Sequence, residues 1–212
     1  MRGVKPPPMS RKFITLEGGE GAGKTTQIKL LADALKAGGL DPIITREPGG
    51  SPAAEVIRSL LVEGAVDRWQ PMTEALLNFA ARLEHVQATI EPALAAGRWV
   101  LCDRFADSTV AYQGYGHDLG RAVIDELHRL VLGYFQPDLT VILDIPVAEG
   151  LARATNRERA EGSREDRYEH MDEGFHQRLR DGFLDIDAAQ EPDKVQAEIR
   201  TVVGQRLKVA WA

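Results

Sequence analysis

The 212-residue sequence contains one cysteine, Cys102, and this scarcity excludes an intrachain disulfide framework and a cysteine-rich metal site. Cys102 lies in the apolar run Trp99-Val100-Leu101-Cys102, which favours a buried structural thiol over a reactive one. No apolar run is long enough for a membrane span, and no apolar core follows the basic residues and prolines of the N-terminus, so a secretory signal is not predicted. We therefore expect a cytoplasmic protein without a membrane partner.

An excess of positive charge is also missing. The 26 Lys and Arg against 32 Asp and Glu leave a net charge of −6, which argues against a nucleic-acid partner held by bulk charge. The five histidines show no metal-ligand spacing. The length suits one domain that can bury a full core. We predict a disordered lead-in over residues 1–11 and a single domain over residues 12–212.

One segment carries a specific chemical signal. Gly18-Gly19-Glu20-Gly21-Ala22-Gly23-Lys24-Thr25 is a complete G-x-x-x-x-G-K-[ST] phosphate-binding loop, and Thr26 follows it. A short apolar run precedes the loop and a helical pattern follows it, which is the setting that phosphate binding requires. Backbone N–H groups and the helix N-terminus would face phosphate oxygens, Lys24 would reach the β- and γ-phosphates, and the Thr25 hydroxyl would ligate Mg²⁺.

The rest of the chain alternates between strand and helix patterns. The predicted strands are Lys12–Leu16, Pro42–Thr45, Trp99–Cys102 and Leu139–Ile145. The predicted helices are Lys24–Ala37, Ser51–Val62, Met72–Ala96 with a possible kink at Pro92, Ala122–Leu132, Val147–Arg159, Tyr168–Phe183 and Pro192–Lys208. This alternation predicts a parallel sheet flanked by helices, a three-layer α/β fold of the P-loop NTPase type.

Charged residues follow two of the predicted strands. Asp103-Arg104 comes directly after one strand and Arg46-Glu47 after another. Because ligands of open α/β sheets bind at the carboxyl ends of strands, the carboxylate of Asp103 suits Mg²⁺ or its waters and the arginines suit phosphate. A surface salt bridge is the alternative.

A second set of side chains could bind a small polar ring. Phe79 and Arg82 are three residues apart on a predicted helix and share a face, although periodicity alone makes Phe79 a core residue. Ser108, Thr109, Tyr112 and Gln113 follow Asp103-Arg104, where they either bind a polar ring or satisfy loop backbone groups.

Several segments together match one family. They are Leu16–Thr26, Thr45–Gly50, Phe79–Arg82, Asp103-Arg104-Phe105 with Ser108, Ala111–Gly114, Pro137–Thr140 with Leu143-Asp144, and Asp166-Arg167-Tyr168-Glu169. On these residues, in unbroken order from about Lys12 to Phe183, the chain resembles the bacterial thymidylate kinases. Many enzymes share the phosphate loop, whereas the T-R-E-P-G-G, A-Y-Q and D-R-Y-E elements together are specific to this family.

The resemblance implies an enzyme that phosphorylates dTMP to dTDP with ATP and Mg²⁺, in dTTP biosynthesis for DNA synthesis, and that forms a homodimer. Phe79 would stack on thymine, Arg82 would bond its O4 side, and Thr109 and Gln113 would lie near the base edge. Tyr112 would pack beside C2′ of the deoxyribose. The remaining expected dTMP contacts are Glu20 at the 3′-hydroxyl, Arg46 and Arg104 at the 5′-phosphate, and Ser108, Asp166 and Tyr168.

The resemblance also implies a mobile arginine-bearing flap, a LID, over about residues 153–167. Some relatives place an arginine inside the phosphate loop, but this chain has Glu20 there, so positive charge for the transferring group must come from elsewhere. We expect Arg153 to serve ATP and at least one of Arg157, Arg159 and Arg164 to enter the site. A solvated charged loop is the plain alternative.

The chain departs from its relatives after Tyr168. In Phe183–Ala188 the end of a helix and the following strand are combined in a shorter segment, so the sequence does not decide whether a fifth strand forms. Two other functions stay open at this point. A kinase of another nucleoside monophosphate is disfavoured by the Phe79/Arg82 and Tyr112/Gln113 pairs. A guanine-reading P-loop switch is disfavoured because the sequence has no N-K-x-D element.

Overall fold

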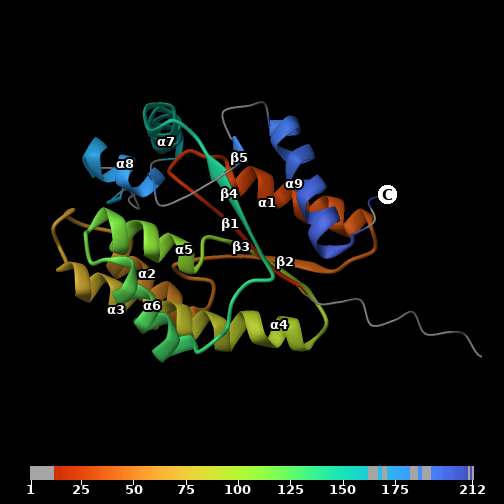
Figure 1. The fold of residues 1–212 in the computed structure, drawn as a ribbon, viewed down its shortest axis with the longest axis horizontal. Helices are drawn as coiled ribbons and strands as arrows, with labels where there is room; N and C mark the ends of the chain where they lie inside the picture. Colours follow the sequence, from red (N-terminus) through yellow and green to blue (C-terminus); the bar gives the residue numbers. More distant parts are fainter. Residues whose placement is uncertain are drawn as a thin grey trace, which may run out of the picture.

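A computed structural model describes residues 12–161, 167–168, 171–181, 186–187, 192–209 and 211. Its sheet has the strand order β2-β3-β1-β4-β5, and every strand pair is parallel (Figure 1). The strands are β1 Phe13–Gly18, β2 Pro42–Arg46, β3 Trp99–Asp103, β4 Leu139–Asp144 and β5 Ile186–Asp187. The sequence did not decide whether a fifth strand forms. The structure contains a two-residue β5 that pairs with the end of β4.

Helices cover both faces of the sheet, as the sequence predicted. The helical elements are α1 Lys24–Ala37, α2 Pro52–Val62, α3 Pro71–His85, η1 Val86–Ile90, α4 Glu91–Ala95, α5 Ala106–Thr109, η2 Val110–Gly116, α6 Arg121–Leu132, α7 Val147–Glu161, α8 Glu173–Asp181 and α9 Pro192–Leu207. Among the described residues, no helix is both long and apolar enough to cross a membrane.

The alternation of side chains along the central strands creates the three layers. Ile14 and Leu16 of β1 and Leu101 of β3 face a core cluster that includes residues of α1 and α9. Their neighbours Phe13 and Val100 face a second cluster with residues of η1 and α4. Because successive residues of a strand point to opposite faces, one apolar run fills both layers. Cys102 is buried in the second cluster, which confirms its structural assignment.

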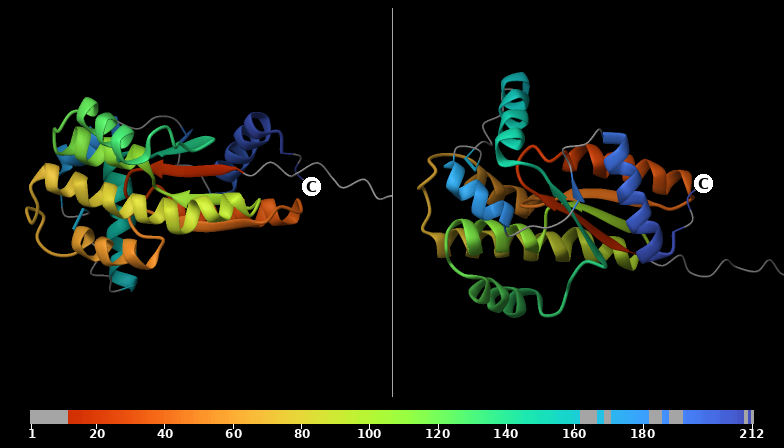
Figure 2. Two further views of the ribbon diagram at one scale, coloured as in Figure 1. Left: turned by 90° about the horizontal axis from the view of Figure 1, so that it is seen from below. Right: turned by 45° about the horizontal axis from the view of Figure 1, so that its top comes forward.

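The predicted helix Met72–Ala96 is one rod with three parts, α3, η1 and α4 (Figure 2). Its middle part, η1, is a π-helix that ends directly before Glu91 and Pro92. Proline lacks an N–H and its ring collides with the carbonyl one turn back, so a wider turn before it relieves the clash. The expected disturbance at Pro92 is therefore a π-helical turn.

One helical segment was missed and the start of one predicted helix was wrong. The structure forms α5 and η2 over Ala106–Gly116, which the sequence analysis did not predict as a helix. The helix predicted from Tyr168 begins only at Glu173, because the carboxylate of Asp172 accepts the N–H of Phe175 and caps the start of α8 at 2.8 Å. The lead-in predicted over residues 1–11 lies outside the described residues.

Candidate nucleotide and phosphate site

The phosphate loop connects the end of β1 to the start of α1, as its sequence predicted. Gly21 and Gly23 have φ angles of 68° and 86°, in the left-handed region that favours glycine. A Cβ at Gly21 would lie 2.0 Å from the carbonyl oxygen of Gly150 on α7, so only glycine fits this approach. The loop is thus pressed between the carboxyl edge of the sheet and α7.

Lys24 folds back over the loop. Its ammonium group donates to the carbonyl oxygens of Gly18 at 3.0 Å and Gly19 at 2.8 Å, and the side chain is buried. Burial, together with the nearby cation of Arg104, lowers the pKa of Lys24 to about 8, although Asp103 and Glu20 act in the opposite direction. A phosphate group offers this ammonium a stronger acceptor than the two carbonyls do.

The two side chains predicted to serve a metal ion meet at the loop. The Thr25 hydroxyl donates to Asp103 Oδ2 at 3.0 Å, which joins the first turn of α1 to the end of β3. A hydroxyl and a carboxylate are hard oxygen donors of the kind that Mg²⁺ takes, usually with waters and phosphate oxygens completing its shell. This pair therefore fits a Mg²⁺ site shared with nucleotide phosphates.

Arg104 links the phosphate loop to the segment after β3. Its guanidinium donates to Gly18 O at 3.0 Å, Ser108 Oγ at 3.2 Å and Glu20 Oε1 at 3.0 Å. The Tyr112 hydroxyl donates to the same Glu20 oxygen, and the guanidinium lies 5.0 Å from the Tyr112 ring centroid. Arg104 has a φ of 71°, so the tertiary contacts hold this residue in a backbone conformation that side chains rarely adopt.

This cluster sets the charge of Glu20. Burial alone would raise the pKa of Glu20, but the cations of Arg104 and Lys24 and the Tyr112 hydrogen bond lower it to about 2. Burial raises the pKa of the Tyr112 hydroxyl well above its usual value. Glu20 is therefore an anion and Tyr112 a neutral donor at neutral pH.

The sequence analysis assigned no role to Glu17, which lies beneath this cluster. Its carboxyl group accepts the Phe105 N–H and the Ser108 hydroxyl, both at 2.6 Å. Burial, with a smaller contribution from Asp107, raises the pKa of Glu17 to about 7. A carboxylate directly after the predicted strand Lys12–Leu16 was the available sequence signal. Glu17 fixes the turn that carries Arg104 and Ser108.

Phe79 and Arg82 contact each other, as their spacing predicted. The Arg82 guanidinium lies between two rings, 5.1 Å from the centroid of Phe79 and 5.1 Å from that of Phe105. Its Nη2 donates to Phe105 O at 2.9 Å and to Thr109 Oγ1 at 2.8 Å. Phe79 is also almost wholly buried, packed with Ala75 and Ile124, so it belongs to the core as well.

Gln113 belongs to a buried network around Glu74, another residue that the sequence analysis missed. Glu74 Oε1 accepts Gln113 Nε2 at 2.8 Å and the Tyr168 hydroxyl at 3.0 Å. Arg167 forms an ion pair with Glu74 and donates to the carbonyl oxygens of residues 61, 65 and 66. Arg167 is wholly buried, and these hydrogen bonds connect it to the end of α2 and the residues that follow α2.

Other predicted site residues lie apart from this cluster or outside the description. Arg46 is exposed and pairs with Glu55 at 3.0 Å. Arg153 is exposed on α7, where Glu149 accepts from it at 2.6 Å. Arg157 and Arg159 lie on α7, but their side chains are not described, and Arg164 and Asp166 lie outside the described residues.

Two comparisons relate the chain to known proteins. Residues 16–199 match the sequence model of the thymidylate kinase family. The chain is 54% identical to a thymidylate kinase of Caulobacter vibrioides over 206 residues, which cover 92% of this chain and 97% of the relative. It is 53% identical to one of Rhizorhabdus wittichii, covering 93% and 91%, and 48% identical to one of Ruegeria pomeroyi, covering 90% and 93%.

Proposed function

Because the chain belongs to the thymidylate kinase family, we propose that the residues gathered at the carboxyl edge of its sheet carry out that family's reaction. The chain is a kinase that phosphorylates dTMP to dTDP with ATP as the phosphoryl donor, a step toward dTTP. The observation that carries the residue assignments is the Arg82 guanidinium. It is stacked against aromatic rings, and its buried Nη1 has no partner among the described residues, as a donor reserved for a nucleobase would be.

On the donor side, residues 18–26 would cradle the ATP phosphates, with Lys24 at the β- and γ-phosphates. Thr25 and Asp103 would hold Mg²⁺, which when bound neutralises charge on the phosphate oxygens. Their 3.0 Å contact supports this pairing, since both oxygens already point to one place. Arg153 on α7 is assigned to ATP by the family resemblance alone.

On the acceptor side, Arg104 would hold the 5′-phosphate of dTMP, because its guanidinium lies against the phosphate loop. Arg46 would join it from the end of β2 after exchanging Glu55 for phosphate. Glu20, an anion, would accept the 3′-hydroxyl, and Tyr112 would stand beside C2′, where a ribose hydroxyl collides with it.

The thymine ring would lie against Phe79 and Arg82, with Thr109 and Gln113 at its edge. Thr109 and Gln113 are buried and each is already oriented, by Arg82 and by Glu74 respectively. Ser108 orients Arg104, and Tyr168 closes the Glu74 network. Asp166 remains an assignment from the family pattern.

The protein has little covalent chemistry to perform in this reaction. Lys24, Arg104 and the LID arginines would align the two phosphates and offset the charge that spreads over the transferring group. We expect the LID, residues 153–167, to bring one of Arg157, Arg159 and Arg164 to that group. No general base is assigned, because an acceptor phosphate dianion needs none.

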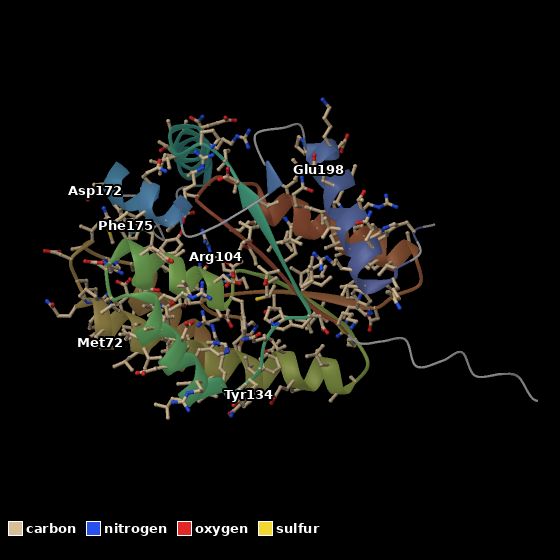
Figure 3. All side chains as sticks on the ribbon, viewed as in Figure 1. Met72, Arg104, Tyr134, Asp172, Phe175 and Glu198 are labelled. Carbon is tan, nitrogen blue, oxygen red and sulfur yellow. The ribbon has the colours of Figure 1, made fainter. Side chains whose placement is uncertain are left out.

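We also assign a homodimer and a cytoplasmic location. Exposed apolar side chains occur on α2, on α3, and on and after α6; they include Val56, Met72, Leu76, Leu130 and Tyr134. Figure 3 places Met72 and Tyr134 at the outer side of the molecule and Arg104 near its middle. Exposed apolar side chains of this kind suit a subunit interface. The buried free thiol of Cys102 suits a reducing compartment.

A coupled ADP-release assay tests the assignment. We expect ATP turnover to depend on dTMP and to be much weaker with dCMP, dGMP or AMP as the acceptor. ATP hydrolysis that does not require an acceptor would support a P-loop switch instead. Equal turnover with another monophosphate would support a kinase of different specificity.

A further inference from the structure

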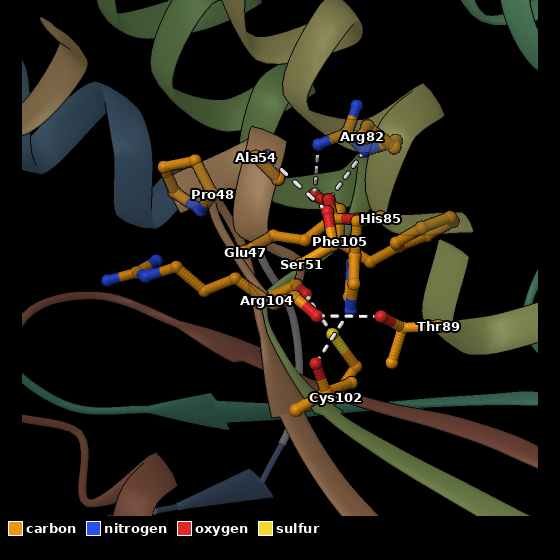
Figure 4. A network of polar contacts seen from close by, with 12 residues as sticks. Glu47, Pro48, Ser51, Ala54, Arg82, His85, Thr89, Cys102, Arg104 and Phe105 are labelled. Carbon is orange, nitrogen blue, oxygen red and sulfur yellow. Dashed lines mark hydrogen bonds and ion pairs between the residues drawn. The ribbon is translucent and has the colours of Figure 1, made fainter. Parts of the chain in front are cut away.

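Glu47 follows β2 at the ligand edge of the sheet, as expected, and its side chain is buried. Its Oε2 accepts from Arg82 Nε at 2.7 Å, and its Oε1 lies 2.9 Å from His85 Nδ1 (Figure 4). His85 is wholly buried, and its Nε2 lies 2.6 Å from Thr45 Oγ1. Thr45, His85, Glu47 and Arg82 thus form a chain of polar contacts from β2 to α3.

The chemistry of these groups determines which of them donates and which accepts in each hydrogen bond. An ionised carboxylate only accepts hydrogen bonds, so His85 Nδ1 must be protonated and donate its hydrogen bond to Glu47. Both carboxylate oxygens of Glu47 are then used, one by His85 and one by Arg82. The carboxylate therefore has no freedom to turn away from Arg82.

The backbone at Gly50 lies close to the side chains of this hydrogen-bonded series. Gly50 has a φ of 84°, and a Cβ there would lie 2.4 Å from His85 Nε2 and 2.6 Å from Thr45 Oγ1. Gly50 is thus required for the close approach of the loop after β2 to α3. The arrangement is held by packing as well as by hydrogen bonds.

Arg82 is consequently held by protein acceptors at two of its three guanidinium nitrogens, and the third has none among the described residues. An arginine has five N–H donors. Nε donates to Glu47, and Nη2 donates to Phe105 O and Thr109 Oγ1. In the part of the chain that the structure describes, Nη1 is buried without an acceptor. A buried N–H without an acceptor is costly, so a ligand that brings an acceptor there is favoured.

We propose that Glu47, supported by His85 and Thr45, is a positioning residue that aims Nη1 of Arg82 at a carbonyl oxygen of the pyrimidine. The inference rests on the proposed function and extends it to base selection. A 4-carbonyl, as in thymine, accepts from Nη1. A 4-amino group, as in cytosine, presents a donor to a donor and leaves Nη1 unpaired.

The kinetic test uses Glu47→Ala and the conservative Glu47→Gln. We expect Glu47→Ala to raise the KM for dTMP roughly tenfold or more, with the KM for ATP unchanged, and to lower the dTMP-to-dCMP ratio of kcat/KM. Glu47→Gln keeps an acceptor for Arg82 Nε and should lose much less. Parental KM values and selectivity in Glu47→Ala would overturn the inference.

A matched control separates positioning from general destabilisation. Val203→Ala removes buried apolar atoms from α9, remote from Arg82, and should lower Tm without changing the KM for dTMP or the selectivity. If Val203→Ala reproduced the kinetic effect of Glu47→Ala, the effect would be one of stability and the inference would be wrong.

A second measurement does not depend on activity. We expect ¹⁵N NMR of the substrate-free protein to show His85 protonated at Nδ1. In Glu47→Gln the amide should donate to Nδ1, and the ring proton should move to Nε2. A parent protein with Nδ1 unprotonated would overturn the inference. A parent protein that showed this tautomer but did not phosphorylate dTMP would overturn the proposed function and leave the Glu47 contact standing.

Discussion

The Thr25 hydroxyl donates a hydrogen bond of 3.0 Å to Asp103, and this contact joins the first turn of α1 to the end of β3. A metal ion shared by the two side chains would compete with it. We predict that Thr25→Val raises the Mg²⁺ concentration needed for half-maximal turnover several-fold, because one hard oxygen ligand is lost. Thr25→Ser keeps the hydroxyl and is the matched control. An unchanged Mg²⁺ titration in Thr25→Val would contradict the metal assignment.

Lys24→Met should reduce kcat by roughly 10²–10³, because one cation that offsets phosphate charge is removed. The side chain is buried against the loop, so methionine keeps most of the packing. The measurement is kcat at saturating ATP and dTMP, with circular dichroism to check the fold. Near-normal turnover in a folded variant would refute the role of the phosphate loop.

Tyr112 is predicted to exclude ribonucleotides by its bulk. Tyr112→Ala should allow phosphorylation of ribothymidylate, whereas Tyr112→Phe keeps the ring and should still reject it. The phenylalanine variant also removes the hydrogen bond to Glu20 and so separates steric exclusion from that contact. The ratio of kcat/KM for dTMP over ribothymidylate is the readout. If the alanine variant is as selective as the parent, Tyr112 does not form the steric barrier.

Glu17 should make stability depend on pH. Its pKa is raised to about 7 in the folded protein from a usual 4.5, so the folded state binds the proton more tightly than the unfolded state does. The free energy of unfolding therefore falls as pH rises from about 4.5 to about 7, by the order of a few kcal/mol. Glu17→Gln mimics the protonated group and should remove this part of the pH dependence.

The measurement is Tm of both proteins at pH 5 and pH 8. We expect Glu17→Gln to gain stability relative to the parent on going from pH 5 to pH 8, because only the parent must bury a charge at the higher pH. Other titrating groups act equally in both proteins. The same Tm difference at both pH values would refute the assignment.

The LID arginines are predicted to act near the transition state. Alanine variants of Arg157, Arg159 and Arg164 should include at least one with a strongly reduced kcat and a nearly unchanged KM for dTMP. Arg167 is the contrasting position, because it is buried on three carbonyl oxygens and Arg167→Ala should lower Tm. Parental kcat in all three LID variants would leave the LID as a cover only.

Local sequence patterns were sufficient for the parts of this protein that short-range physics determines. The glycine loop, the four longer strands and most helix limits follow from glycine spacing, apolar runs and proline positions, which act within a few residues. The contact between Phe79 and Arg82 followed in the same way, since three residues make nearly one helical turn. The start of α8 was missed although its Asp172 cap is a local signal, three residues before Phe175, and the α5–η2 helix, whose Tyr112 contacts the distant Glu20, was not expected.

Only the tertiary structure decided which charged groups are buried and with which partners. Arg46 and Glu47 are neighbours at the end of β2, yet Arg46 is exposed and Glu47 lies inside against Arg82 and His85 of α3. The pKa of Glu17 is likewise raised to about 7 only because strands and α5 enclose its carboxyl group. Burial and pairing depend on residues far away in the sequence. The sequence by itself thus determined which reactive groups the chain carries, and folding determined their charges and orientations.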